Sequence, residues 1–273
     1  MKTNKPVVKN RCLALTRAGM MEGLVFRTSM FANIAANAFY LILIYFLWRA
    51  IYASSPTGIV NGMSFYDTMI YLVLASAMFN FMDEFVVWNV GDDYQTGKIV
   101  MYLTKPMDYQ KYMFWALSGN IVINFLVTFV PTFIVVCIVA RGTLVFGWNI
   151  LFFFLSLVFA TALNFMVDFF VGIICFYTQS VWGVNIMKEV VVALLSGATI
   201  PLAFFPELLR KVVNVLPFQA IYNTPLQMLT DKSLTFLGYG KMFVLQLIWL
   251  GIAFVATRIF WSIAKRKLTV NGG

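Results

Sequence analysis

Two places in the sequence carry side chains whose types and spacing could do chemistry. The first is the pair Asn164 and Asp168, which lies inside a long apolar segment and, at a spacing of four, on one face of a helix. An ionisable group at membrane depth costs several kcal/mol unless it meets a partner or water. The pair is therefore a candidate intramembrane polar site, either for a proton or ion or for a structural hydrogen bond to a neighbouring helix.

The second place is the polar segment that begins at Gly91, which invites comparison with a phosphate-binding P-loop. The comparison fails, because five residues instead of four separate Gly91 from Gly97 and because Ile99, instead of Ser or Thr, follows Lys98. No buried strand precedes the segment. If ATP drives this protein, another polypeptide must bind it.

Other signs of an enzyme are missing from the sequence. Histidine is absent, which removes the commonest general base, and the three cysteines have no metal-ligand spacing. The charged pairs Asp83-Glu84 and Lys188-Glu189 are interpreted as anchors of helix ends, and Asp92-Asp93 lies at the edge of the apolar part. We therefore expect a chain without catalytic activity and without a bound cofactor or metal.

Composition decides which solvent surrounds the chain. Of its 273 residues, 61% are hydrophobic and 11% are charged, whereas soluble domains carry about 25% charged residues. A water-soluble fold of this length could not hide so much apolar surface, so lipid must replace water around most of it. The net charge of +9 is then a signal for orientation in the membrane and not for nucleic-acid binding.

Six apolar segments are long enough to cross a membrane as helices, which takes about 20 residues each. The sequence thus predicts an all-α integral membrane protein with about six transmembrane helices. Pro131 predicts a kink in the third, and Gly197 and Pro201 break the fifth near its end. The expected spans are residues 30–51, 65–88, 115–140, 144–177, 186–205 and 242–263.

Lysine and arginine residues gather at three places that fall on one side of the membrane if six spans alternate. By the positive-inside rule, this side is the cytoplasm and both termini are cytoplasmic. The opposite side has Arg141 in one loop, and Arg210, Lys211 and Lys232 depart from the pattern. The three groups are Lys2, Lys5, Lys9, Arg11, Arg17 and Arg27; Lys98, Lys105 and Lys111; and Lys265, Arg266 and Lys267.

Three segments have a character of their own. Residues 1–29 are expected to form a basic interfacial helix ahead of a single membrane domain, residues 30–273. Residues 91–111 form a cytoplasmic stretch of mixed charge. Residues 206–217 are amphipathic and too short to span, so they should lie in the interface or dip in and return. With their flanks they form a short outer re-entrant hairpin, residues 197–225, between the fifth and sixth spans.

Short motifs follow one another in order along the chain. The first runs from Thr96-Gly97-Lys98 to Leu103-Thr104-Lys105-Pro106, between the second and third spans. The later motifs are Ser196-Gly197, Pro201, Phe205-Pro206, Leu216-Pro217-Phe218, Tyr222 and Pro225. This succession, over essentially the whole chain, resembles the ABC-2 type permease family, the membrane subunits of one class of ABC exporters.

The resemblance implies a bacterial plasma (inner) membrane protein that works as two permease chains, identical or paralogous, with separate ABC ATPase subunits. ATP and magnesium would bind to the ATPase, membrane lipid would surround the permease, and nucleic acid would play no part. The residues implied in coupling, through a cytoplasmic coupling helix, are Asp92, Asp93, Gly97, Lys98, Lys105 and Pro106. The residues implied in an outer gate are Gly197, Pro201, Phe205, Pro206, Pro217 and Phe218.

Other functions compete with this one. A stand-alone secondary transporter or channel would use Asp168 as its ion site, and Asp168→Asn should then abolish coupling. A membrane-embedded enzyme acting on lipids would need a catalytic constellation that the sequence lacks. The architecture itself does not choose among lipid, glycolipid, drug, peptide and ion substrates.

Overall fold

The computed structural model describes residues 7–25, 27–82, 84–140, 144, 147–178 and 180–267. Asp83, Arg141, Lys2 and Lys5, which were named above, lie outside these ranges.

Apart from its turns and connecting loops, the described part of the chain is helical except for one hairpin, whose tight turn is made by Asn61 and Gly62, both at positive φ. The strands are β1 (Ile59–Val60) and β2 (Met63–Ser64). The helices are α1 (Val7–Val25), α2 (Arg27–Ala53), α3 (Phe65–Met82), α4 (Val86–Gln95), α5 (Ile99–Leu103), α6 (Tyr109–Asn124), α7 (Val130–Val139), α8 (Trp148–Thr178), α9 (Val181–Leu195), α10 (Glu207–Val213), α11 (Asn223–Thr230) and α12 (Phe236–Ala264). Short 3-10 turns occupy Leu202–Phe204, Phe218–Ala220 and Lys265–Lys267, and a π-helical segment occupies Phe125–Phe129.

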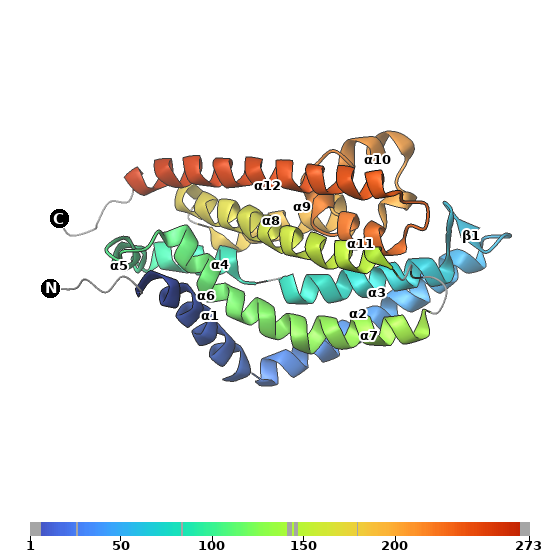
Figure 1. Ribbon diagram of the computed structural model, residues 1–273, viewed down its shortest axis with the longest axis horizontal. Coiled ribbons are helices and arrows are strands. Elements are labelled where there is room, and N and C mark those ends of the chain that lie inside the picture. Colours follow the sequence, from blue (N-terminus) through green and yellow to red (C-terminus); the bar gives the residue numbers. More distant parts are fainter. Residues whose placement is uncertain are drawn as a thin grey trace.

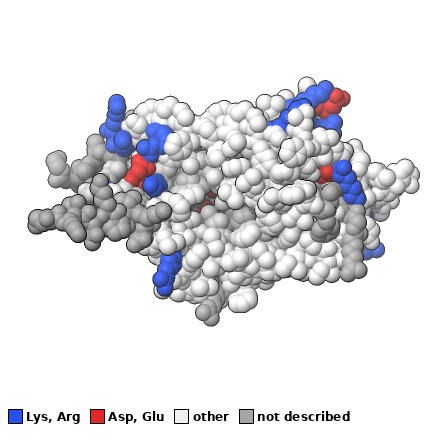
Figure 2. All heavy atoms as spheres, in the orientation of Figure 1, with Lys and Arg blue, Asp and Glu red and all other residues white. Residues whose placement is uncertain are grey.

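Most of the long helices run along the long axis of the molecule (Figure 1). α5 lies at one end of this axis, and β1, α10 and α11 lie at the other. On the face shown in Figure 2, the charged side chains gather towards the two ends and leave a wide uncharged band between them. This distribution is that of a protein whose middle is surrounded by lipid.

Five helical segments are long and apolar enough to cross a membrane, so the prediction of a multi-pass, all-helical membrane protein is confirmed. They are Met30–Ala53, Phe65–Gln95, Tyr109–Val139, Trp148–Thr178 and Phe236–Ala264. The fifth expected span, residues 186–205, is present only as α9, which has 15 residues and ends at Leu195. The chain turns there because Gly197 takes a φ of +82°, a conformation that favours glycine.

The second and third spans also differ from their predicted bounds. The second is broken after Met82 and resumes as α4, which reaches Gln95 instead of ending near residue 88. The third begins at Tyr109, where the Asp108 side chain caps α6 by accepting from the backbone N–H of Lys111. Near Pro131 the helix changes to the π-helical segment, because proline has no N–H to donate to the preceding turn.

The N-terminal helix α1 packs directly along α6. Their backbones meet at two glycines: a Cβ on Gly19 would lie 2.3 Å from the carbonyl oxygen of Ala116, and one on Gly119 would lie 2.3 Å from that of Thr16. The Thr16 and Ser118 hydroxyls are also hydrogen-bonded, at 2.9 Å. Small residues at a helix crossing allow this close approach within a membrane.

The two largest clusters of buried apolar side chains divide the interior along the long axis. The division is clearest on α8, where Leu163 belongs to the first cluster and Phe165 to the second. Along the broken span it falls between Met82 and Val86. Asn164 therefore lies at the boundary between two apolar regions, in a layer where other polar side chains also gather.

Candidate functional site

The side chain of Asp168 is the centre of a buried polar group between α8 and α9. Asp168 is only 1% exposed, its Oδ1 lies 3.1 Å from Lys188 Nζ, and its Oδ2 accepts a 3.1 Å hydrogen bond from Asn164 Nδ2. The structure thus brings together the two predicted polar residues and adds a cation. The interpretation of Lys188 as a helix-end anchor is wrong, because Lys188 lies in the middle of α9 and faces Asp168.

Asn164 also donates a hydrogen bond to the backbone at the break in the second span. Between α3 and α4 the backbone N–H groups of Glu84 and Val86 donate to the carbonyls of Met82 and Glu84, so the regular helical pattern is lost. Asn164 Nδ2 donates to the Met82 carbonyl at 3.2 Å. A backbone group released from a helix within a membrane must find such a partner, because no water is available in lipid.

A polar cavity of about 560 Å³ opens beside the break, between α1, α2, α3 and α6. Glu84, which is 6% exposed, lines it and accepts a 3.2 Å hydrogen bond from Asn124 Nδ2. Asn120 also lines it, and the buried Oδ1 of Asn120 has no hydrogen-bond partner among the described residues. The cavity therefore presents a carboxylate and an unsatisfied acceptor.

A second cavity, of about 410 Å³, lies between α2, α3 and α9. It shares Phe79 and Asn80 with the first cavity. The Ser76 hydroxyl donates to the Asn37 side chain at its wall, and Glu189, another wall residue, accepts from Asn185. Because the two cavities share Phe79 and Asn80 of α3 and both have polar residues in their walls, we call the pair the polar path below.

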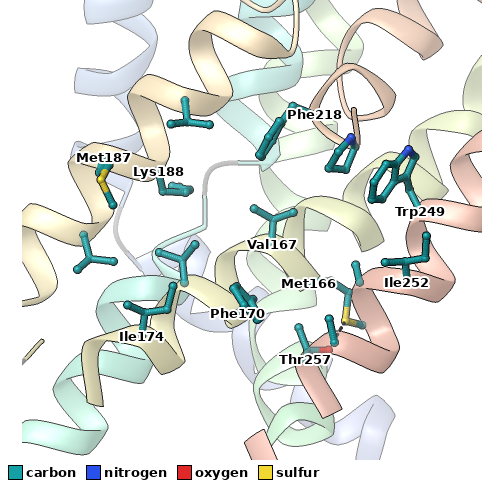
Figure 3. Close-up of a pocket in the computed structure, with 16 residues that line it drawn as sticks. Met166, Val167, Phe170, Ile174, Met187, Lys188, Phe218, Trp249, Ile252 and Thr257 are labelled. Atoms are coloured by element: carbon teal, nitrogen blue, oxygen red, sulfur yellow. Dashed lines mark hydrogen bonds between the residues drawn. The ribbon is translucent and has the colours of Figure 1, made fainter. Parts of the chain in front are cut away.

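An apolar groove of about 350 Å³ lies between α8, α9 and α12 (Figure 3). Met166 and Phe170 from α8 and Ile252 from α12 line it, and Phe218 and Trp249 close one end. Of the described residues that line this groove, Lys188 alone is charged, and its ammonium is directed to Asp168. The groove offers apolar contacts and little polar chemistry.

The comparison with known families shows which class of protein has this architecture. Residues 38–272 match a family whose description is ABC-2 family transporter protein. The chain belongs to the ABC-2 transporter family. The match covers most of the chain, so the resemblance that its motifs indicated is confirmed. A search among curated proteins found no match. ABC-2 permeases are transmembrane subunits of ABC transporters and are normally non-catalytic.

In this ABC-2 protein, the residues expected to couple to an ATPase surround α5. Lys98 Nζ donates to Asp92 Oδ2 at 2.9 Å on the surface, and this hydrogen bond raises the pKa of the Lys98 amine above its ordinary value. Asp93, in contrast, is buried and accepts a 2.8 Å hydrogen bond from the Tyr109 hydroxyl. Gly97, at a φ of +73°, makes the turn that separates α4 from α5.

The remaining coupling candidates follow α5. The Lys105 ammonium lies over the rings of Tyr102 and Tyr112, 4.1 Å and 4.8 Å from their centroids, and Pro106 is exposed in the turn before α6. Of the six candidates, the structure therefore groups Asp92 with Lys98 on the surface and turns Asp93 inward.

The predicted gate residues of this ABC-2 protein lie in a series of turns between α9 and α11. At the first turn, the backbone N–H of Asn223 donates to the Ser196 carbonyl at 3.2 Å, and the Tyr71 hydroxyl donates to Asn223 Oδ1 at 3.2 Å. Gly197 fits under Tyr71, because a Cβ there would lie 2.8 Å from the Tyr71 hydroxyl. Pro201 is buried immediately after this turn, and Phe205 is half-buried.

The amphipathic segment forms the short helix α10, which Pro206 precedes and Pro217 follows. Val213 is buried, whereas Leu208 and Val212 are exposed, as expected of a helix whose apolar side rests in a membrane interface. Trp249 of α12 holds the end of this segment by donating to the Val215 carbonyl at 2.9 Å. Phe218, the last predicted gate residue, lies in the turn Phe218–Ala220 and lines the apolar groove together with Pro217.

The sequence analysis missed the polar path, although the sequence carries a signal for it. Polar residues recur every four positions within apolar segments, which places them on one face of each helix. Only the pair Asn164 and Asp168 was recognised. The other sets are Asn33 and Asn37; Ser76, Asn80 and Glu84; Asn120, Asn124 and Thr128; and Asn185 and Glu189.

Proposed function

We propose that this chain is the permease subunit of an ATP-driven ABC-2 exporter. Residues 30–273 form one membrane domain of six spans, with α9 as a short fifth span and both termini in the cytoplasm of a bacterium. Two such chains, identical or paralogous, assemble with separate ATPase subunits, which bind ATP and magnesium and hydrolyse the ATP. The permease itself carries the substrate out of the cytoplasm.

The surface around α5 is the observation that carries this proposal. Met101 and Leu103 are 60% and 44% exposed, next to the exposed Lys98, although α5 is far from the uncharged band of the molecule. Ile99, on the other side of α5, is buried in the second apolar cluster. An exposed apolar surface ringed by basic residues is typical of a protein-binding site.

The base of this surface is fixed to the spans on both sides. The Tyr109 hydroxyl joins α6 to Asp93 of α4 at 2.8 Å, and Arg258 Nη1 of α12 lies 2.7 Å from Asp108 Oδ1. When ATP binding closes the ATPase pair, a displacement of α5 therefore moves α4 and α6 with it. α4 begins at the break beside Asn164, so the movement of α4 reaches the buried polar layer.

On the outer side, the turns of residues 197–225 act as the gate in this proposal. One of the side chains that hold them to the spans is Gln246 of α12, which donates to the Ala220 carbonyl at 2.8 Å and accepts from the Ser156 hydroxyl at 2.9 Å. Changes in the packing of α8 against α12 are transmitted to the outer turns through this side chain. Opening of these turns would release the substrate.

Purification of the tagged chain from its native membrane in a mild detergent tests the proposal. We expect a Walker-motif ATPase to copurify, and a cysteine in place of Met101 to cross-link to that ATPase. A cysteine in place of Leu208, on α10, is the control and should give no such cross-link. Repeated recovery of the chain without any ATPase would contradict the proposal.

The alternative, a secondary transporter or channel with Asp168 as its ion site, stays a prediction. The ion pair weakens it, because the Lys188 ammonium already occupies the position next to Asp168 that a coupling cation would take. ATP-independent transport that Asp168→Asn abolishes would favour this alternative.

A further inference from the structure

The polar path is a site for which neither the family nor the coupling mechanism supplies a ligand. Its walls present side-chain carbonyl and carboxylate oxygens, with Glu84 and Glu22 in the first cavity and Glu189 in the second. None of the described residues that line either cavity is a lysine or an arginine. The path therefore favours positive charge and repels anions.

The first cavity also lacks a donor for one of its acceptors. Asn120 Oδ1 is buried without a hydrogen-bond partner among the described residues, and an unmade hydrogen bond of a buried group costs about 1–3 kcal/mol. Asn124, one turn further along the same helix, donates its side-chain N–H to Glu84. A ligand that donates hydrogen bonds would satisfy Asn120 Oδ1.

Aromatic side chains complete the surroundings of the path. Phe79 lines both cavities, Phe85 lines the first and Tyr40 lines the second. Aromatic faces attract organic cations and also accept apolar groups. The path is bounded by α2, whose apolar part is not buried within the chain, so a molecule dissolved in the lipid can reach it from the side.

We propose that the polar path binds the positively charged, hydrogen-bond-donating end of a lipophilic cation, with its apolar body against Phe79 and α2. The role of this molecule as the exported substrate rests on the proposed function, but its binding does not. Glu84 supplies the charge that attracts the cation, Asn120 accepts a hydrogen bond from it, and Asn80 lies at the junction of the two cavities.

Two probes with the same alkyl chain test the charge preference: octylammonium, a cation whose head group donates hydrogen bonds, and octyl sulfate, an anion. Equilibrium dialysis against the full chain in lipid nanodiscs should show saturable binding of the cation and none of the anion beyond that of empty nanodiscs. Glu84→Gln should weaken cation binding about tenfold, the size expected for the loss of one interaction with a charged group. Glu207→Gln, on the exposed surface of α10, is the matched control and should leave it unchanged.

A second variant keeps the proposal open to refutation if Glu84→Gln does not fold. Asn80→Lys places a positive charge between the two cavities, so it should abolish cation binding and permit anion binding. Equal binding of both probes, or variants with unchanged affinity for the cation, would overturn the proposal. Because this assay contains no ATPase, its result is independent of the copurification experiment.

Discussion

Asp168 and Lys188 form a buried ion pair that joins α8 to α9, with 3.1 Å between Oδ1 and Nζ. In a region of low dielectric constant, each of the two charged side chains is stabilised by the opposite charge of the other. Removal of one partner leaves the other charge uncompensated and costs about 3–5 kcal/mol, whereas apolar replacement of both is often neutral. The pair thus joins two spans through an interaction that is sensitive to a change in either helix.

The single variants Asp168→Asn and Lys188→Met should therefore lower the unfolding temperature of the purified chain, and the double variant should recover most of the loss. Thermal unfolding followed by tryptophan fluorescence measures this. The exposed pair Glu207 and Lys211, at 2.6 Å on α10, is the control, because exposed helical pairs contribute only about 0.3–0.5 kcal/mol. A double variant as unstable as the single ones would show that the two charges do not depend on one another.

Asn164→Leu should destabilise the chain because it removes two buried hydrogen bonds, one to the Met82 carbonyl at the break and one to Asp168 Oδ2. A hydrogen bond to a charged group contributes about 1.5–3 kcal/mol. Thr161→Val is the matched control on the same helix, since the Thr161 hydroxyl donates only to the Leu157 carbonyl of α8 itself. Asn164→Leu should lower the unfolding temperature clearly more than Thr161→Val does. Equal decreases for the two variants would argue against a special role for Asn164.

Gly19→Ala and Gly119→Ala should separate α1 from α6, because either Cβ would meet a backbone carbonyl oxygen at 2.3 Å. Overpacking of this kind costs about 1–3 kcal/mol. Gly240→Ala and Gly251→Ala on α12 are the controls: nothing lies within 4 Å of either Cβ, and alanine favours a helix over glycine by about 1 kcal/mol. The unfolding temperature should fall for the first two variants and stay or rise for the controls.

Lys98→Glu and Lys105→Glu should reduce the amount of ATPase that copurifies with the chain, because both reverse the charge at the edge of the α5 surface. Lys211→Glu, at the other end of the molecule, should leave copurification unchanged. Thermal unfolding of all three variants checks that the fold is kept. Undiminished ATPase recovery with both α5 variants would contradict the assignment of this surface.

Much of the fold could be predicted from the sequence because lipid imposes simple demands on length and polarity. Four of the six expected spans correspond to long apolar helical segments, as does the second once its break is included. The break after Met82 could not be predicted, since Val86–Gln95 is itself helical and its first residues, Val86 to Trp88, continue the apolar pattern across the break. α9 was predicted too long because Ile200 and Leu202 continue the apolar pattern beyond the turn at Gly197.

The candidate site was less accessible to sequence reasoning. Asp168 was recognised because a lone acid in an apolar segment is conspicuous, but its partner was not, since the sequence does not say which spans are neighbours. Asn120 and Asn124 lie about 40 residues from Glu84 in sequence and meet it only because α6 packs near the break. Single asparagine residues in an apolar segment change a hydropathy profile little, so the profile does not reveal them. Their spacing of four nevertheless places them on a shared helix face.

The division of the second span into α3 and α4 has a mechanical consequence. A continuous helix would transmit any tilt of one end to the other as a rigid rod. Here the helix is interrupted between α3 and α4, and Asn164 donates a hydrogen bond to the backbone at the interruption. The two halves can therefore change their angle. In the proposed mechanism, α4 therefore moves with α5 without forcing α3 to move with it, so that the two ends of the path need not open together.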